Sequence, residues 1–119
     1  MENNIDMRFA IAINSDFKES DIIAIIKNTI PHFVVITPVA LKVSKNMLVL
    51  DQNDLYDLKK INEENGWLYY KYELSVFPVE ETTLEYQRDL ADLLLKIFRG
   101  KGLMSEIISD DNFSERRSF

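Results

Sequence analysis

Large apolar residues alternate with small or polar residues near the start of the chain. They occupy every second position over residues 7–13, a repeat that is typical of a β-strand with one buried face. Over residues 22–30 the isoleucines are instead spaced as on one side of a helix. The sequence therefore predicts a strand followed by a helix that Ser20 caps and Pro31 ends.

Residues 32–43 carry a second apolar pattern, which Pro38 interrupts. The run before the proline is rich in β-branched residues and an alternation resumes after it, so we expect one strand that is bent or interrupted at Pro38. Because proline lacks the N–H that a central strand needs, this strand is expected at a sheet edge or with a bulge. Residues 44–46 then predict a turn into residues 47–50, which would complete a hairpin.

The next stretch predicts a connection and then the clearest strand of the chain. Apolar spacing allows a short helix over residues 54–62, whereas the polar run over 62–66 favours an exposed connection, and both remain open. Residues 67–77 alternate strictly and predict a strand. Its expected core face consists of Leu68, Tyr70, Tyr72, Leu74 and Val76. Trp67 and Tyr69 would lie on the other face.

A second helix is predicted towards the end of the chain. Thr82 and Glu85 have the spacing of a capping box, in which each side chain accepts a hydrogen bond from a free backbone N–H. The inward stripe of this helix is expected to consist of Leu84, Ala91, Leu94, Leu95 and Phe98, with Leu90 and Ile97 beside it. Gly100 or Gly102 is expected to end this helix in a left-handed conformation, and a last strand is expected to follow.

The order of these elements predicts a single α+β domain over residues 1–119, with a polar tail at 110–119. Two helices that alternate with strands can cover one face of a mostly antiparallel sheet, which is a two-layer sandwich of ferredoxin-like or related type. The chain has 119 residues, and a hydrophobic content of 46% is enough for one core. It has no cysteine, and its start lacks the basic and apolar regions of a secretion signal, so we expect a cytoplasmic protein that does not enter membranes.

Acidic residues are concentrated in one part of the chain. The formal net charge is −6, and residues 51–92 contain eleven acidic residues but four basic ones. A negative field repels phosphate backbones and anionic lipids and favours a basic partner. The same charge is also typical of a surface that only keeps a protein soluble.

The residue types of most catalytic and cofactor sites are scarce. The three glycines are too dispersed to cradle a phosphate, and the only histidine, His32, lies next to a proline at a predicted strand start. The carboxylates from Asp51 to Asp57 could approach a metal ion, but they lack the glycine and the distant glutamate of an EF-hand loop. We therefore expect no enzymatic activity, no cofactor and no metal.

Trp67 and Tyr69 are expected to be the exposed aromatic residues of the long strand, beside acidic loops. With Lys71 they imitate the stacking residues of RNA-binding sheets, but the surrounding negative charge disfavours nucleic acid. Aromatic residues within an acidic rim favour a basic protein partner. A dimer mate that covers the same face is an equally simple explanation.

Several features of this chain occur together. It is small and acidic, it has no cysteine and no catalytic motif, and its C-terminal half contains three notable segments. The segments concerned are Gly66-Trp67-Leu68-Tyr69-Tyr70, Gln87-Arg88-Asp89-Leu90-Ala91 and Asn112-Phe113. In these features the chain resembles the small acidic immunity proteins of bacterial contact-dependent growth-inhibition and related polymorphic toxin systems. The resemblance implies a non-enzymatic inhibitor that binds a basic toxin, often a nuclease, and blocks its active site with carboxylates that mimic phosphates. It assigns no contact residue by itself.

Charge and aromatic content together define the expected partner surface. Its residues are Asp51, Asp54, Asp57, Glu63, Glu64, Trp67, Tyr69, Glu80 and Glu81. Two other functions remain open at this point. One is a homo-oligomeric regulatory or ligand-binding domain, and the other is a small enzyme whose acidic residues bind a metal.

Overall fold

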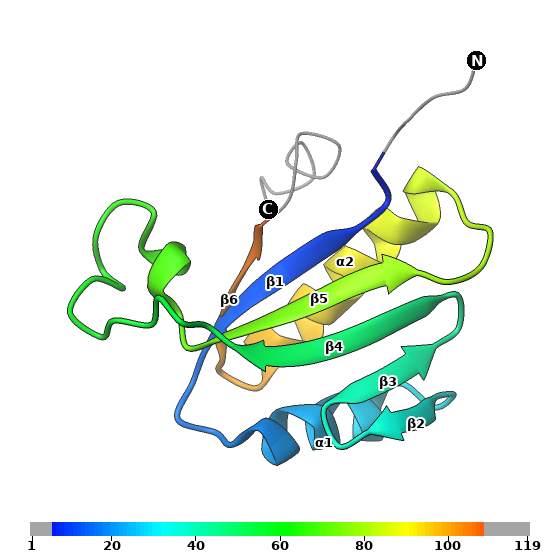
Figure 1. The fold of residues 1–119 in the computed structure, drawn as a ribbon, viewed down its shortest axis with the longest axis horizontal. Coiled ribbons are helices and arrows are strands. Elements are labelled where there is room, and N and C mark those ends of the chain that lie inside the picture. Colours follow the sequence, from blue (N-terminus) through cyan, green and yellow to red (C-terminus); the bar gives the residue numbers. More distant parts are fainter. Residues whose placement is uncertain (1–5, 109–119) are drawn as a thin grey trace.

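Two α-helices, one short 3₁₀-helix and six strands make up the computed structural model, which describes residues 6–108 (Figure 1). In chain order the elements are β1 (Phe9–Asn14), α1 (Glu19–Thr29), β2 (Val34–Thr37), β3 (Ala40–Val43), β4 (Asn46–Gln52), η1 (Gly66–Tyr69), β5 (Tyr72–Pro78), α2 (Leu84–Gly100) and β6 (Met104–Ile108). The polar tail predicted at 110–119 lies outside the described residues.

All six strands belong to one antiparallel sheet with the order β2-β3-β4-β5-β1-β6. Without the β2–β3 hairpin, the chain runs β1-α1-β4-β5-α2-β6 and the sheet order is β6-β1-β5-β4. These are the two interleaved split β-α-β units of a ferredoxin-like sandwich. The hairpin is added between α1 and β4 and extends the sheet at one edge. The predicted α+β class and antiparallel sheet are confirmed.

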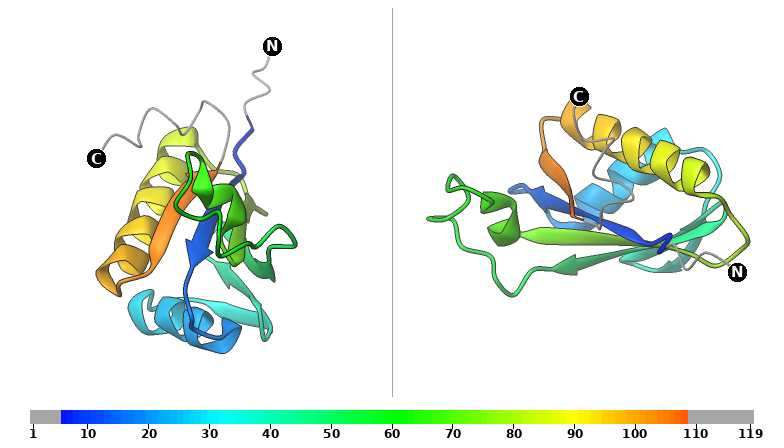
Figure 2. Two further views of the ribbon diagram at one scale, coloured as in Figure 1. Left: turned by 90° about the vertical axis from the view of Figure 1, so that its left-hand side faces the viewer. Right: turned by 90° about the horizontal axis from the view of Figure 1, so that it is seen from above.

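Both helices lie on the same face of the sheet, and the core fills the space between the two layers (Figure 2). α1 buries Ile22, Ile23 and Ile26 there, and α2 buries the predicted apolar stripe from Leu90 to Phe98. The strands contribute Phe9, Ile11, Ile13, Leu41, Val43, Leu48, Leu50, Tyr72, Leu74, Val76 and Ile107. Alternation along β1, β3 and β5 and helical spacing along the two α-helices therefore identified the buried faces of these elements correctly.

The prediction of one strand over residues 32–43, bent or interrupted at Pro38, is wrong because the chain reverses direction there. β2 and β3 are two antiparallel strands, with Val34 opposite Lys42, and Pro38 lies in the turn between them. A proline can end a strand and pre-set a turn as readily as it can bend a strand, because both need only its fixed φ. The prediction that Pro38 marks a sheet edge or a bulge is confirmed. β2 is the edge strand, and its register shifts between Val35 and Thr37.

The strand predicted over residues 67–77 begins only at Tyr72. The residues before it turn into η1, which follows Asn65 in a left-handed conformation with φ of 60°. Leu68, which was expected in the core, is exposed, whereas Tyr70 is buried. Alternation of apolar residues continued through η1 by coincidence, and no helix forms over 54–62.

Two predicted helix caps are displaced by one or two residues. Thr83, and not Thr82, caps α2, because its Oγ1 accepts a hydrogen bond from the N–H of Tyr86 at 3.1 Å. α1 begins at Glu19, so Ser20 lies inside it, and the Asp21 carboxylate accepts from the N–H of Lys18 at 3.2 Å.

The predicted stop of α2 and the β3–β4 hairpin are confirmed. Gly102 has φ of 82°, and its N–H donates to the Arg99 carbonyl at 3.0 Å. In the hairpin, Val43 is opposite Asn46, and the left-handed Ser44 has φ of 54°.

Candidate functional site

The connection from β4 to β5 projects beyond the sheet at one end of the molecule (Figure 1). We call residues 53–71 the projecting loop. Asn53 holds its base together, because its Nδ2 donates to the carbonyl oxygens of Leu68 at 2.9 Å and Tyr70 at 2.7 Å. The Oδ1 of Asn53 accepts from the N–H of Leu55 at 3.0 Å, so one side chain ties the start of the loop to its end.

Further contacts determine the path of the projecting loop. The N–H of Asp57 donates to the Tyr69 carbonyl at 3.1 Å, which joins the two sides of the loop. A Cβ atom at Gly66 would lie 2.0 Å from the carbonyl oxygen of Ile61, so a residue with a side chain cannot take this position without moving the backbone. The loop is therefore held by its own backbone hydrogen bonds and by the Asn53 side chain.

Four apolar side chains of the projecting loop are exposed to solvent. Leu55 and Leu58 are 61% and 65% exposed, and Tyr56 and Leu68 are also exposed. We define the apolar end as Phe17, Leu55, Tyr56, Leu58, Leu68 and Met104. Several apolar residues so exposed at one end of a small domain are typical of an interaction surface rather than of an ordinary surface.

A hollow of about 400 Å³ lies within the apolar end. Tyr56 and Leu58 line it from the projecting loop, Phe17 lines it from the β1–α1 connection, and Met104 lines it from the start of β6. The hydroxyl of Tyr72 donates to the Phe17 carbonyl at 2.7 Å, which fixes the backbone on that side. Three connections that are far apart in the sequence thus form one surface.

The residues predicted for the partner surface fall into two separate groups. Asp51, Asp54, Asp57, Glu63, Glu64, Trp67 and Tyr69 lie at the end of β4 or on the projecting loop. Glu80 and Glu81 follow β5 and lie at the opposite end of the sheet (Figure 1). There the Glu80 carboxylate forms an ion pair with the Lys42 Nζ at 2.6 Å.

Trp67 and Tyr69 were expected on the outer face of a strand and lie instead on η1. Both are half-buried, and the Nζ of Lys60 is 5.1 Å from the centre of the Tyr69 ring. Residues 51–71 hold five carboxylates and three lysines. The negative charge of this end is therefore modest, and its exposed aliphatic and aromatic residues distinguish it more clearly.

The sequence prediction missed Phe17, Leu55, Tyr56, Leu58 and Met104 as surface residues. One available signal was the run from Asp54 to Leu58, in which apolar residues alternate irregularly with acids and fit neither a strand nor a long helix. Phe17 and Met104 carried no such signal, because only the fold brings their connections beside the projecting loop.

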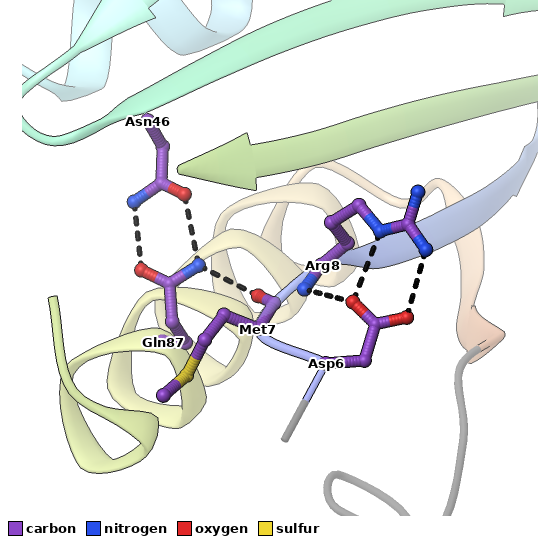
Figure 3. Close-up of polar contacts among 5 residues, drawn as sticks. All are labelled: Asp6, Met7, Arg8, Asn46 and Gln87. Atoms are coloured by element: carbon purple, nitrogen blue, oxygen red, sulfur yellow. Dashed lines mark hydrogen bonds and ion pairs between the residues drawn. The ribbon is translucent and has the colours of Figure 1, made fainter. Parts of the chain in front are cut away.

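A polar cluster at the other end of the sheet is buried and structural (Figure 3). Asn46 and Gln87 are both fully buried, and their side-chain amides exchange two hydrogen bonds of 2.9 and 2.8 Å. Gln87 also donates to the Met7 carbonyl at 2.9 Å and accepts from the Thr82 hydroxyl at 3.2 Å. This pair connects β4, α2 and the segment before β1, and it is not accessible to a ligand.

Titratable groups do not assemble into a metal site within the described part of the chain, where no three histidine or acidic side chains lie together. Burial raises the pKa of Tyr70, the nearby Glu106 carboxylate raises it further, and Arg99 acts in the opposite direction. The Tyr70 phenol is therefore neutral at ordinary pH and not a base. Over residues 6–108 neither helix combines the length and apolar content needed to cross a membrane.

Neither the models of known protein families nor the curated proteins match this sequence, and no solved structure matches the chain.

Proposed function

We propose that this protein is a non-enzymatic binding module that acts as an immunity protein and neutralises a basic toxin. The observation that carries the proposal is the apolar end, where exposed apolar side chains line a hollow together with polar residues of the neighbouring connections. The projecting loop on one side of this hollow is held by its own backbone and by the Asn53 side chain. Carboxylates of Asp54, Asp57, Glu63 and Glu64 belong to the same loop. Apolar centre and charged rim are the usual anatomy of a protein interface.

Each part of this surface has a different physical role in binding. Leu58 and Tyr56 lose contact with water when the partner covers them, and this supplies most of the affinity. The carboxylates attract a basic partner before contact and so increase the association rate. Because Asn53 and the backbone already hold the loop, binding has little conformational entropy to overcome.

The toxin as the partner rests on the resemblance to immunity proteins. If the toxin is a nuclease, its active site binds phosphates through basic side chains, and the carboxylates of the projecting loop can occupy those positions. The proposal then requires that the apolar end cover the rim of the toxin active site. Inhibition is by occlusion, without chemistry on either protein.

An immunity protein is expected to be encoded directly after its toxin gene, so the first test is whether such a gene lies directly upstream and whether its toxin domain binds the full chain. We expect the purified proteins to form a complex, and co-expression to protect cells from the toxin. Replacing Leu58 and Tyr56 together by serine should weaken binding by at least about a hundredfold, as expected for two central apolar residues. The matched control is Leu93→Ser, which removes a leucine exposed on α2.

A second pair of variants tests the carboxylates. Glu63→Gln with Glu64→Gln should slow association and reduce its dependence on salt, whereas Glu80→Gln with Glu81→Gln, at the other end of the sheet, should not. An equal effect of both pairs on the association rate would mean that the rate depends on the net charge of the protein and not on where the carboxylates lie. Undiminished affinity of the serine variant would overturn the proposed surface.

A homo-oligomeric regulatory domain is the second candidate function. The observation that favours it is the edge strand β2, where Val34, Val35 and Ile36 are exposed in succession. This surface is distinct from the projecting loop, so both functions can exist in one protein.

A further inference from the structure

The two edges of the sheet differ in how they are protected. β2 forms one edge, and its Val34, Val35 and Ile36 are 57%, 51% and 50% exposed. β6 forms the other edge and carries Glu106, whose carboxylate lies 3.5 Å from the Arg99 guanidinium. Edge strands expose free backbone N–H and C=O groups, and charged side chains are a common means of preventing another strand from pairing with them. β2 has no such charge.

The residues around β2 limit the length of this strand, but they leave its free edge accessible for pairing. Pro31 and Pro38 stand on either side of the strand, and its register shifts between Val35 and Thr37. A short strand of this kind cannot template an extended fibre. It can still pair with one other short strand through the backbone groups that face away from β3.

We propose that β2 is a homodimer interface, in which the β2 strands of two copies pair antiparallel across a two-fold axis and join both sheets into one. The observations behind this are three successive exposed apolar residues on an uncharged edge strand. In a two-fold interface the same patch meets itself, so the patch must be complementary to itself. The sequence Val-Val-Ile-Thr satisfies this condition, because it places no like charges opposite one another.

The charged groups close to β2 do not oppose this pairing. Lys42 on the neighbouring strand β3 is neutralised by Glu80 at 2.6 Å. Lys27 of α1 lies 5.9 Å from the centre of the Phe33 ring, and thus over an aromatic face. A hollow of about 300 Å³, lined in part by Phe33, Val34 and Lys42, lies beside the strand and has room for an aliphatic side chain of the second copy.

Pairing of β2 with β6 of another copy is the less favourable arrangement. It would place Glu106 along an apolar strand, and it would leave a free edge at each end of the assembly. Pairing of β2 with itself closes the assembly at two copies. The interface is small, below the roughly 800 Å² per partner of stable complexes, so we expect a weak dimer with a Kd on the order of tens of micromolar.

The test is sedimentation of the purified full chain without any partner, over concentrations from about 1 µM to about 500 µM, which bracket the expected Kd. The wild-type protein should pass from monomer to dimer over this range. Val35→Lys should raise the Kd at least about tenfold, because two lysines would then meet in the interface. Leu93→Lys, a matched change of an exposed leucine on α2, should retain the wild-type Kd.

Hydrogen exchange places the interface independently of these variants. The amides of residues 34–37 should exchange more slowly at high protein concentration, and those of the projecting loop should not change. Circular dichroism and Tm show whether each variant is folded, and Val34→Lys repeats the test at a second position. The Kd of a lysine variant is interpreted only when these measurements show that the variant is folded.

Three results would overturn the proposal. They are a monomer at every concentration, a dimer that both lysine variants leave intact, and a dimer that Leu58→Lys dissociates while Val35→Lys does not. The last result would place the dimer contact at the apolar end. Toxin binding is measured separately, so loss of one activity with retention of the other distinguishes this proposal from the proposed function.

Discussion

The two ends of the sheet use polar and apolar groups in opposite ways. At the amide end, formed by the β3–β4 turn and the start of α2, Asn46 and Gln87 are buried and their amides bond each other. At the apolar end, Leu55 and Leu58 are exposed on a loop held by backbone hydrogen bonds. Burying a polar pair orients the elements around it, whereas exposing apolar groups leaves surface for another molecule to cover. The difference indicates which end stabilises the fold and supports the proposal that the other end binds a partner.

Substitution at the amide end should have the largest effect on stability. Gln87→Ala should lower the free energy of unfolding by about 3 kcal/mol, because it leaves the buried Asn46 amide unpaired and creates a cavity. Urea denaturation at neutral pH measures this loss. Replacing both residues by leucine should cost less than the sum of the two single changes, since no unpaired polar group remains. A loss below about 0.5 kcal/mol for Gln87→Ala would show that the pair is not important for stability.

Removing the support of the projecting loop should have a smaller and more local effect. Asn53→Ala deletes the hydrogen bonds to the Leu68 and Tyr70 carbonyls and should cost about 1–2 kcal/mol. Amides of the loop should exchange faster in this variant, while those of β1 and α2 keep their protection apart from any global change. Asn62→Ala, at an exposed position of the same loop, is the matched control. Uniform acceleration over the whole chain would mean that the loop is not a separate unit.

The ion pair at the amide end should produce a small effect that depends on pH. The hydrogen bond from Lys42 lowers the pKa of Glu80, and the charge of Lys42 lowers it further. A carboxylate with a lowered pKa in the folded state contributes stability above its unfolded pKa, and this contribution is lost as the pH falls through the folded pKa. In Lys42→Met the Glu80 pKa, followed by NMR titration of the carboxyl carbon, should rise towards its ordinary value. An unchanged titration would show that the pair does not persist in solution.

Changes at the apolar end should have the smallest effect on stability. Leu58→Ser should alter the free energy of unfolding by no more than about 0.5 kcal/mol, because the side chain is already largely in water. Thermal and urea unfolding beside the wild type measure this. Stability that falls as much as in Gln87→Ala would contradict the distinction between the two ends.

Some elements were predictable from neighbouring residues alone. The buried stripe of α2 follows from helical spacing, and the buried faces of β1 and β5 follow from alternation. A left-handed end of α2 at Gly100 or Gly102 follows from the one residue type that adopts this conformation without cost, and the structure places it at Gly102. Each of these features depends on a local repeat or a local backbone requirement.

Other elements were not predictable in this way. Pro38 permits both a bend and a turn, and only pairing with β3 shows which one occurs. Apolar alternation continued from Trp67 into β5, although the chain turns into η1 after the left-handed Asn65. Gln87 has the helical spacing of a core residue but a polar side chain, and its partner Asn46 is 41 residues away in the sequence.

By itself, the sequence determined which face of each helix and of most strands is apolar, because those faces depend on periods of two and 3.6 residues within each element. It also determined the excess of acidic residues and the uncharged composition of β2. Only the tertiary structure decided that the projecting loop, Phe17 and Met104 share one end of the molecule and that Glu80 and Glu81 lie at the other. It decided too that β2 is the edge of the sheet. These are relations between distant segments, and they arise because long-range strand pairing and helix packing bring those segments together.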